Sequence, residues 1–235
     1  MRLIFVRHPQ TEGNVKRLIY GRYDAQYSEE GRKSIPGIVE ALRDVKFDAL
    51  IASPLSRTRY LAEEIAADHG LTPEAVRYDD RILEMNFGVL EAMTTKEAKE
   101  KQKEVYDGLM ADYEQYVIPE GESCVMVYER VGQFLEDIYA EFEGRPQKEE
   151  LSTWEEWSGT VKESRVKAET RREKTIVVVA HSMVIHVALA CLLKIALHEI
   201  WHIKIEPGSL VDLDWRCDFA MLQGLAGPFN IREIQ

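Results

Sequence analysis

The sequence of 235 residues is poor in cysteine and has no long apolar segment. Its three cysteines, Cys124, Cys191 and Cys217, are odd in number and far apart, which argues against a disulfide framework and for a reducing compartment. No apolar run approaches the roughly 20 residues of a membrane-spanning helix. The apolar stretch before Arg7 is too short for a signal peptide. These absences predict a cytoplasmic protein with no membrane partner.

Net positive charge is also missing from this chain. Its 41 acidic and 30 basic residues give a formal net charge of −11. A protein that binds duplex nucleic acid usually has the opposite balance, so we expect no nucleic-acid partner. A negative field repels anionic ligands at long range, and an anionic substrate therefore needs a local cluster of cations. Such a cluster lies near the N-terminus and consists of Arg7, Lys16, Arg17 and Arg22.

Short apolar runs alternate with longer amphipathic segments along the chain. The runs predict strands at residues 3–6, 49–52, 76–78, 175–180 and 210–213. The amphipathic segments predict helices at residues 28–43, 55–69, 94–116, 123–142 and 182–194, with Pro36-Gly37 weakening the first of them. The run at 175–180 is β-branched throughout, as is typical of the centre of a parallel sheet. We expect an α/β fold, specifically a three-layer α/β/α sandwich around a mostly parallel sheet.

Three predicted strands end at residues suited to phosphate chemistry. His8 follows the first strand, His181 follows the strand at 175–180, and Arg57 opens the helix after the second strand. Ligands of open α/β sheets bind beyond the carboxyl ends of the strands, so these side chains should converge in one crevice. Helix N-termini at the same edge supply backbone N–H donors for phosphate.

The residues around His8 resemble a known family signature. Arg7-His8-Pro9-Gln10-Thr11-Glu12-Gly13-Asn14 is similar to the Arg-His-Gly-x-Thr-x-x-Asn motif of the histidine phosphatase (phosphoglycerate mutase-like) superfamily. Four further blocks follow in the order of that family. They are Ser53-Pro54-Leu55-Ser56-Arg57-Thr58, Leu83-Glu84-Met85-Asn86-Phe87-Gly88-Val89-Leu90-Glu91, Gly121-Glu122-Ser123 with Arg130 after it, and Val179-Ala180-His181-Ser182.

The resemblance implies a role for each of these residues. His8 is expected to attack phosphorus and become a phosphohistidine, which requires a neutral imidazole that the nearby arginines favour. Glu84 is expected to act as general acid and then as general base. The expected phosphate and substrate contacts are Arg7, Thr11, Asn14, Tyr20, Gly21, Arg57, His181 and Ser182, with Arg7, Arg57 and His181 also counted as catalytic. No metal or cofactor is implied, because the arginines supply the positive charge.

The resemblance also implies the domain organisation. We expect residues 1–235 to form a single histidine phosphatase domain. A small helical cap, at about residues 90–120, is expected after the third strand. Residues 145–174 are highly charged with few periodic apolar positions, and we interpret them as a solvated insertion.

Three positions depart from the family pattern. Pro9 and Ser182 stand where the family usually has glycine, and Ala92 replaces the glycine that often follows the second glutamate. Proline offers neither a positive φ nor an amide donor. These departures bear on the rate and on the shape of the substrate more than on the class of reaction.

The sequence is consistent with four interpretations of the function of this site. The resemblance favours hydrolysis of a small phosphorylated metabolite over phosphoglycerate mutase-type transfer. The interval from Glu84 to Gly121 is short for a cofactor-dependent mutase and lacks the paired arginines that bind the substrate there. Its cations are Lys96, Lys99, Lys101 and Lys103. An inactive phospho-ligand binding protein is conceivable because of Pro9. His198-Glu199-Ile200-Trp201-His202 matches the zinc hydrolase pattern but has no third ligand at the required spacing. Glu91 is the alternative acid, and a homodimer is left open.

Overall fold

The computed structural model describes residues 1–144, 173–216 and 219–227. The predicted charged insertion falls almost wholly outside these described residues, as does Cys217. None of the described helices combines the length and apolar character needed to cross a bilayer.

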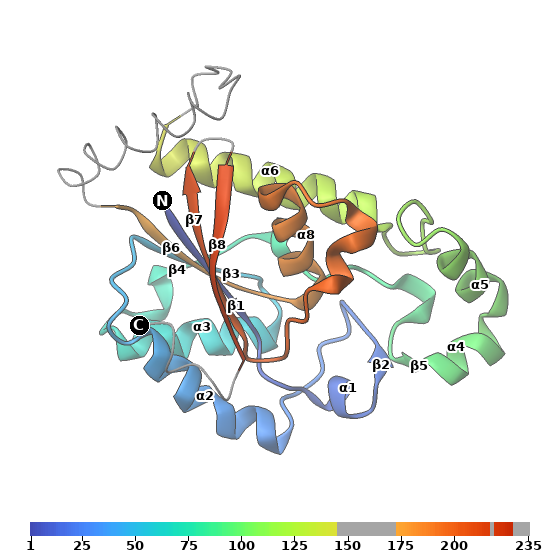
Figure 1. The fold of residues 1–235 in the computed structure, drawn as a ribbon. Coiled ribbons are helices and arrows are strands. Elements are labelled where there is room, and N and C mark those ends of the chain that lie inside the picture. Colours follow the sequence, from blue (N-terminus) through green and yellow to red (C-terminus); the bar gives the residue numbers. More distant parts are fainter. Residues whose placement is uncertain (145–172, 217–218, 228–235) are drawn as a thin grey trace, which may run out of the picture.

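A six-stranded sheet forms the centre of the molecule (Figure 1). Its strands are β1 (Arg2–Arg7), β3 (Ala49–Ala52), β4 (Val76–Tyr78), β6 (Thr175–Ala180), β7 (Leu210–Arg216) and β8 (Phe219–Ala226), in the order β4-β3-β6-β1-β7-β8. The first four are parallel, whereas β7 pairs antiparallel with β1 and β8 pairs antiparallel with β7. The predicted α/β class with a mostly parallel sheet is confirmed, but β8 was not predicted.

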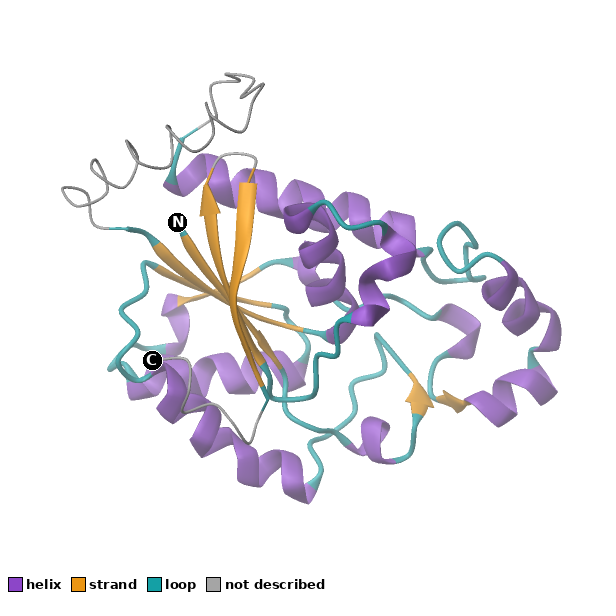
Figure 2. Ribbon diagram, in the orientation of Figure 1, coloured by secondary structure: helices purple, strands orange, loops and turns teal. Residues whose placement is uncertain are grey.

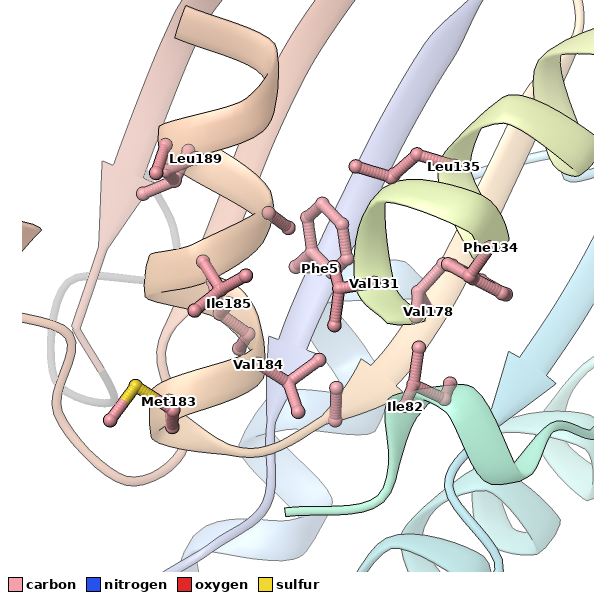
Figure 3. Packing of buried hydrophobic residues seen from close by; sticks show 14 of the residues in the cluster. Phe5, Ile82, Val131, Phe134, Leu135, Val178, Met183, Val184, Ile185 and Leu189 are labelled. Atoms are coloured by element: carbon pink, nitrogen blue, oxygen red, sulfur yellow. The ribbon is translucent and has the colours of Figure 1, made fainter. Parts of the chain in front are cut away.

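Helices cover both faces of the sheet (Figure 2). They are α2 (Glu29–Leu42) and α3 (Ser56–Asp68) on one face, and α6 (Cys124–Phe142) and α8 (Ser182–Leu193) on the other. Side chains of β1 alternate between two cores: Ile4 and Val6 pack with α2 and α3, whereas Phe5 packs with α6 and α8 (Figure 3). This alternation follows from the two-residue period of a strand and produces the three layers.

Helix α2 continues through Pro36, contrary to the expected weakness at that point. Pro36 is exposed, so its ring lies on the solvent side of the helix. The opposite face buries Ile35, Ile38, Val39 and Leu42, and this burial outweighs the hydrogen bond that proline removes.

A helical excursion (residues 93–118) projects to one side of the sheet (Figure 1). It contains β5 (Met93–Thr94), which pairs with β2 (Leu18–Ile19), and then α4 (Thr95–Lys101) and α5 (Lys103–Ala111). The prediction of one helix over residues 94–116 was wrong. Gln102 adopts φ −131° and ψ 42°, outside the helical region, so the segment splits into two short helices.

The two ends of the excursion are joined to each other at its base. Val89 N donates to Pro119 O at 3.1 Å, and Asn86 N donates to the Glu122 carboxylate at 2.8 Å. Gly88 adopts φ +48°, and a Cβ there would lie 2.0 Å from Pro119 O, so only glycine allows this approach.

The remaining elements are short. They are α1 (Glu12–Val15) and the 3₁₀ helices η1 (Pro73–Ala75), η2 (Asp80–Ile82), η3 (Gly88–Leu90) and η4 (Leu197–His202).

Candidate active site

The carboxyl ends of β1 and β6 bring two histidines together. The strands are in register from Arg2 and Thr175 to Arg7 and Ala180, so His8 and His181 follow at the same level of the sheet. Their ring centroids are 5.3 Å apart. Both imidazoles are buried, and His8 lies at the wall of a cavity of about 400 Å³. The predicted convergence of strand ends is therefore present in the fold.

A backbone carbonyl fixes the tautomer of His8. Its Nδ1 lies 2.7 Å from Pro9 O. A carbonyl oxygen can only accept, so Nδ1 carries the proton and Nε2 keeps a free lone pair. Burial lowers the pKa of His8 well below its usual value, and the charges of Arg57 and Arg7 lower it further. These contacts favour a neutral imidazole at His8 with a free lone pair on Nε2.

Arg57 is held by the loop before α2. Its Nη2 donates to Gly21 O at 2.6 Å and its Nη1 donates to Tyr23 O at 3.2 Å, with Asp24 Oδ1 at 3.4 Å. Arg7 is held on the other side, where Nη1 donates to Ile205 O. These contacts orient both guanidinium groups but leave the Nε atom of each without a hydrogen-bond partner in the described part of the chain.

His181 adds a third unpartnered nitrogen. Its Nε2 lies 2.7 Å from Ser53 Oγ, whereas its buried Nδ1 has no partner among the described residues. Burial, followed by the charge of Arg57, lowers the pKa of His181 well below its usual value. A buried donor without a partner costs about 1–3 kcal/mol. The Nε–H groups of Arg7 and Arg57, which line the cavity with His8, are therefore suited to donate to an anion, and His181 Nδ1 can add a third donor in the tautomer that carries its proton there.

Glu84 enters the cavity from the segment between β4 and η3. Its Oε1 accepts a hydrogen bond from Met85 N at 3.0 Å, and its Oε2 accepts one from Met183 N at 3.2 Å. Glu84 is almost fully buried, and it lines the cavity with His8, Arg7 and Arg57. These two hydrogen bonds from backbone N–H groups hold the carboxyl group in a fixed position at the start of α8.

The chain matches the model of a known protein family over most of its length. The model of the histidine phosphatase superfamily, branch 1, matches residues 3–147 and 145–225. The chain belongs to the histidine phosphatase superfamily. Membership supports phosphatase-type chemistry, and the predicted resemblance is confirmed.

Curated relatives of this histidine phosphatase family member have different names. Phosphoserine phosphatase 1 of Hydrogenobacter thermophilus is 28% identical over 209 residues, covering 89% of this chain and 84% of that protein. Probable phosphoglycerate mutase GpmB of Erwinia tasmaniensis is 32% identical over 136 residues, covering 58% of this chain and 62% of that protein. The crystal structure of the alpha-ribazole phosphatase from Shigella flexneri superposes with a TM-score of 0.75 at 24% identity, covering 97% of each chain. This structural likeness shows the fold.

Among the predicted contact residues of this family member, Asn14, Tyr20 and Ser182 line the cavity with Arg7 and Arg57, whereas Thr11, Gly21 and His181 do not. Thr11 caps α1, and its Oγ1 lies 2.6 Å from Tyr20 Oη and donates to Asn14 Oδ1. Because Asn14 Oδ1 is used in this way, its Nδ2 group is the part left to donate. Gly21 sits behind Arg57, where a Cβ would lie 1.6 Å from Met85 O.

Glu91, the alternative acid, has a different place in this structure. Its carboxylate accepts hydrogen bonds from the backbone N–H groups of Gly21, Arg22, Tyr23 and Phe87 at 2.9–3.0 Å. Glu91 does not line the cavity that holds His8. The carboxylate instead ties the loop that holds Arg57 to the loop that follows Glu84.

The N-terminal cluster of cations is less concentrated than expected. Of its four members, Arg7 alone lines the cavity. Lys16 lies 3.9 Å from Glu12, and Arg22 lies 3.6 Å from Glu122. The expected local positive field therefore comes from Arg7 together with Arg57.

The zinc hydrolase pattern falls on η4, which is a 3₁₀ helix. With three residues per turn, positions four apart do not share one face, so His198 and His202 are badly placed to bind one ion. His198 is exposed and lies 3.2 Å from Glu114. In the described ranges, no group of three or more His, Cys, Asp or Glu side chains is arranged to hold a metal ion.

Sequence reasoning missed the apolar wall of the cavity. Its members come from α5, α8, η4 and two connecting segments, and they include Phe87, Tyr106, Met110, Tyr113, Met183 and Trp201. The amphipathic pattern of residues 103–113 was a usable signal, because apolar side chains on an excursion need a surface to face.

The depressed pKa values predict a pH-dependent stability. Both histidines are neutral when folded, but they titrate near pH 6.5 when unfolded. Below about pH 6.5 the unfolded chain therefore binds more protons, and the folded state loses up to about 1.4 kcal/mol per pH unit for each histidine. Urea unfolding from about pH 7.5 to about pH 5 should show this loss, with stability rising again as pH rises.

The double variant His8→Ala/His181→Ala is the control for this pH dependence. It should show a smaller loss of unfolding free energy over the same pH range. A pH dependence equal to that of the unsubstituted chain would contradict the assignment of two buried neutral histidines.

Proposed function

We propose that the protein hydrolyses a small phosphomonoester through a phosphohistidine intermediate on His8. The observation that carries this proposal is that His8 lines one cavity with Arg7 and Arg57 and has its ring 5.3 Å from that of His181. Arg7 Nε, Arg57 Nε and His181 Nδ1 are buried and have no partner among the described residues, and the pKa of His8 is lowered, which favours the neutral imidazole. A phosphoryl group supplies oxygens for these donors and an electrophilic atom for His8 Nε2.

The first step transfers the phosphoryl group to the enzyme. His8 Nε2 forms a bond to phosphorus while the bond from phosphorus to the ester oxygen breaks. Arg7 and Arg57 stabilise the charge that spreads over the phosphoryl oxygens. Protonated Glu84 gives its proton to the departing oxygen, so the alcohol leaves neutral.

The second step returns the phosphoryl group to water. Glu84, now ionised, takes a proton from a water molecule, and that water attacks phosphorus as the bond to His8 Nε2 breaks. The products are inorganic phosphate, a free imidazole at His8 and a protonated Glu84 ready for the next turnover.

In this scheme, the hydrogen bond with Ser53 determines which ring nitrogen of His181 carries the proton. For His181 Nδ1 to donate to a phosphoryl oxygen, its Nε2 must accept from Ser53 Oγ, which lies 2.7 Å away. The lowered pKa of His181 favours the neutral form that this arrangement needs. Pro9 fits the same scheme, because the scheme needs only its carbonyl oxygen, which accepts from His8 Nδ1, and not a backbone N–H. The proline was the main argument for an inactive binding protein, so that alternative loses its support.

Hydrolysis is proposed over mutase-type transfer because of the cations in the cavity. Arg7 and Arg57 are the two arginines that line it in the described chain, and no lysine does. A phosphoglycerate mutase must also bind the carboxylate of its substrate. Product analysis distinguishes the two reactions, since hydrolysis releases inorganic phosphate and a mutase returns an isomeric ester.

The test of the intermediate is phosphoryl trapping. The purified chain, mixed with a ³²P-labelled ester and quenched within milliseconds, should carry label that is lost in acid and kept in alkali. That stability identifies phosphohistidine and excludes a phosphoserine ester. Release of phosphate with no such label, at any quench time, would count against the proposed route.

Glu84→Gln should separate substrates by their leaving groups. Glutamine preserves the shape of the side chain but has no proton to give, so kcat for an alkyl phosphate should fall about 10²-fold or more. Nitrophenyl phosphate has a stable leaving group and should lose far less in its phosphorylation step. Single-turnover rates of label transfer from both esters measure this difference. Equal losses would mean that Glu84 positions other groups and does not donate a proton.

A further inference from the structure

Most of the cavity lining other than Arg7, His8, Arg57 and Glu84 is apolar or aromatic. We propose that the alcohol part of the substrate is a flat apolar group on a short chain and that it carries no carboxylate. This inference rests on the proposed phosphatase function and names the class of ester that the same site accepts.

The apolar wall comes from elements on both sides of the cavity. Tyr106 and Met110 lie on α5, Tyr113 lies just after α5, and Trp201 lies on η4. Each of these side chains is uncharged and presents apolar or aromatic surface that a ligand can contact. A cavity of about 400 Å³ lies within the range of sites that enclose a small organic group.

Trp201 is a fixed aromatic surface at this wall. Its ring lies 4.8 Å from the His186 ring and meets the Tyr113 ring edge to face at 5.9 Å. His186 is itself anchored, with Nε2 2.8 Å from Ile203 O. Trp201 is nevertheless 49% exposed, and Met110 is 54% exposed. Large apolar side chains that are held in place and still exposed gain stability by covering an apolar ligand.

The charges around the cavity argue against a carboxylate on the alcohol part. The arginines that line the cavity in the described chain are Arg7 and Arg57, which the proposed function assigns to the phosphoryl group, and the carboxyl group of Glu84 lines the same cavity. No lysine of α4 or α5 lines the cavity. Lys101 pairs with Glu97 at 3.0 Å, and Lys99 lies over the Tyr106 ring at 5.3 Å. A carboxylate buried against the apolar wall would lose its water without gaining a cation. Phosphoserine and phosphoglycerates are therefore expected to be poor substrates.

Three esters of primary alcohols test this inference: ethyl phosphate, 2-phenylethyl phosphate and O-phosphoserine. Their leaving groups are all primary alkoxides, so differences in kcat/KM report recognition of the alcohol part. Burial of a phenyl ring should raise kcat/KM for 2-phenylethyl phosphate about 30-fold or more above that for ethyl phosphate. Phosphoserine should fall at or below ethyl phosphate. The same order should hold for Kd, measured by calorimetry on the full-length His8→Ala variant.

Trp201→Ala should lower the ratio of kcat/KM for 2-phenylethyl phosphate to that for ethyl phosphate about tenfold. Trp201→Phe should keep most of that ratio. Met126→Ala is the matched control, because Met126 is a comparably exposed methionine on α6 that does not line the cavity. Circular dichroism establishes that each variant is folded.

Tighter binding or faster turnover of phosphoserine than of 2-phenylethyl phosphate would overturn the inference, as would an unchanged ratio in folded Trp201→Ala. Failure of the proposed function has a different signature. It is the absence of acid-labile label with every ester, and the order of Kd values on His8→Ala still decides the inference in that case.

Discussion

Replacing His8 with alanine is expected to remove the acid-labile phosphoryl label and to lower kcat at least about 10⁴-fold. Alanine has no nitrogen that can attack phosphorus. In the proposed scheme His181 cannot replace His8, because its Nε2 accepts from Ser53 Oγ and its Nδ1 carries the proton, so neither nitrogen has a free lone pair. The fold should persist. The position is held by the pairing of β1 with β6 and by a backbone bond from His8 N to Ala180 O at 3.1 Å, which alanine keeps.

The measurement is ³²P incorporation together with phosphate release under the same conditions. His69→Ala is the matched control, since His69 caps the C-terminus of α3 and bonds to Ile65 O and Val45 O, outside the cavity. That variant should be labelled like the unsubstituted chain. Undiminished labelling of His8→Ala would show that another residue receives the phosphoryl group.

Replacing Arg57 with lysine is expected to lower kcat about 10²-fold or more. The guanidinium Nη1 and Nη2 donate to Tyr23 O and Gly21 O, while Nε has no partner among the described residues and is proposed to donate to the substrate. An ammonium group has a single nitrogen and cannot satisfy the loop and a phosphoryl oxygen in these directions. The positive charge is kept, so the loss measures geometry and not net charge.

Steady-state kinetics on one good ester and the rate of label transfer test this effect. Arg59→Lys serves as the control, because Arg59 lies two positions further along α3, is exposed and bonds to Glu63 at 2.9 Å. It should behave like the unsubstituted chain. A near-normal kcat for Arg57→Lys would place Arg57 outside the reacting centre.

The phosphate end of the cavity was predictable from the sequence, for a physical reason. His8 and His181 each follow a buried strand directly, and Arg57 lies at the start of the helix after β3. The edge of a parallel sheet brings such positions together. The tautomer of His8 was not predictable. It depends on where Pro9 O points, which is a property of the folded loop.

The apolar end of the cavity was not predictable in the same way. Trp201 lies inside a segment that matches a zinc hydrolase pattern, and its neighbours Tyr113 and His186 are far away in the sequence. No local period links three such elements. Their meeting is decided by how η4 and the helical excursion pack, and so by tertiary structure alone.

The strands of the sheet also differ in how far their own sequences predict them. Strong runs such as residues 175–180 were placed correctly because burial on both faces leaves a clear signal. Strand β8 was missed because its sequence includes Gly224 and does not alternate cleanly. It is defined by its pairing with β7, which is irregular between Asp212 and Leu213.

The hydrogen bonds at the base of the helical excursion have a consequence for how this protein can change. Hydrogen bonds from Val89 to Pro119 and from Asn86 to Glu122 close the excursion at its base. Residues 95–117 lie inside this closure and beyond both Glu91, which ties down the loop that holds Arg57, and β5, which pairs with β2. A different sequence grafted at 95–117 would therefore change the wall offered to the alcohol part of the substrate and keep the contacts that position Arg57.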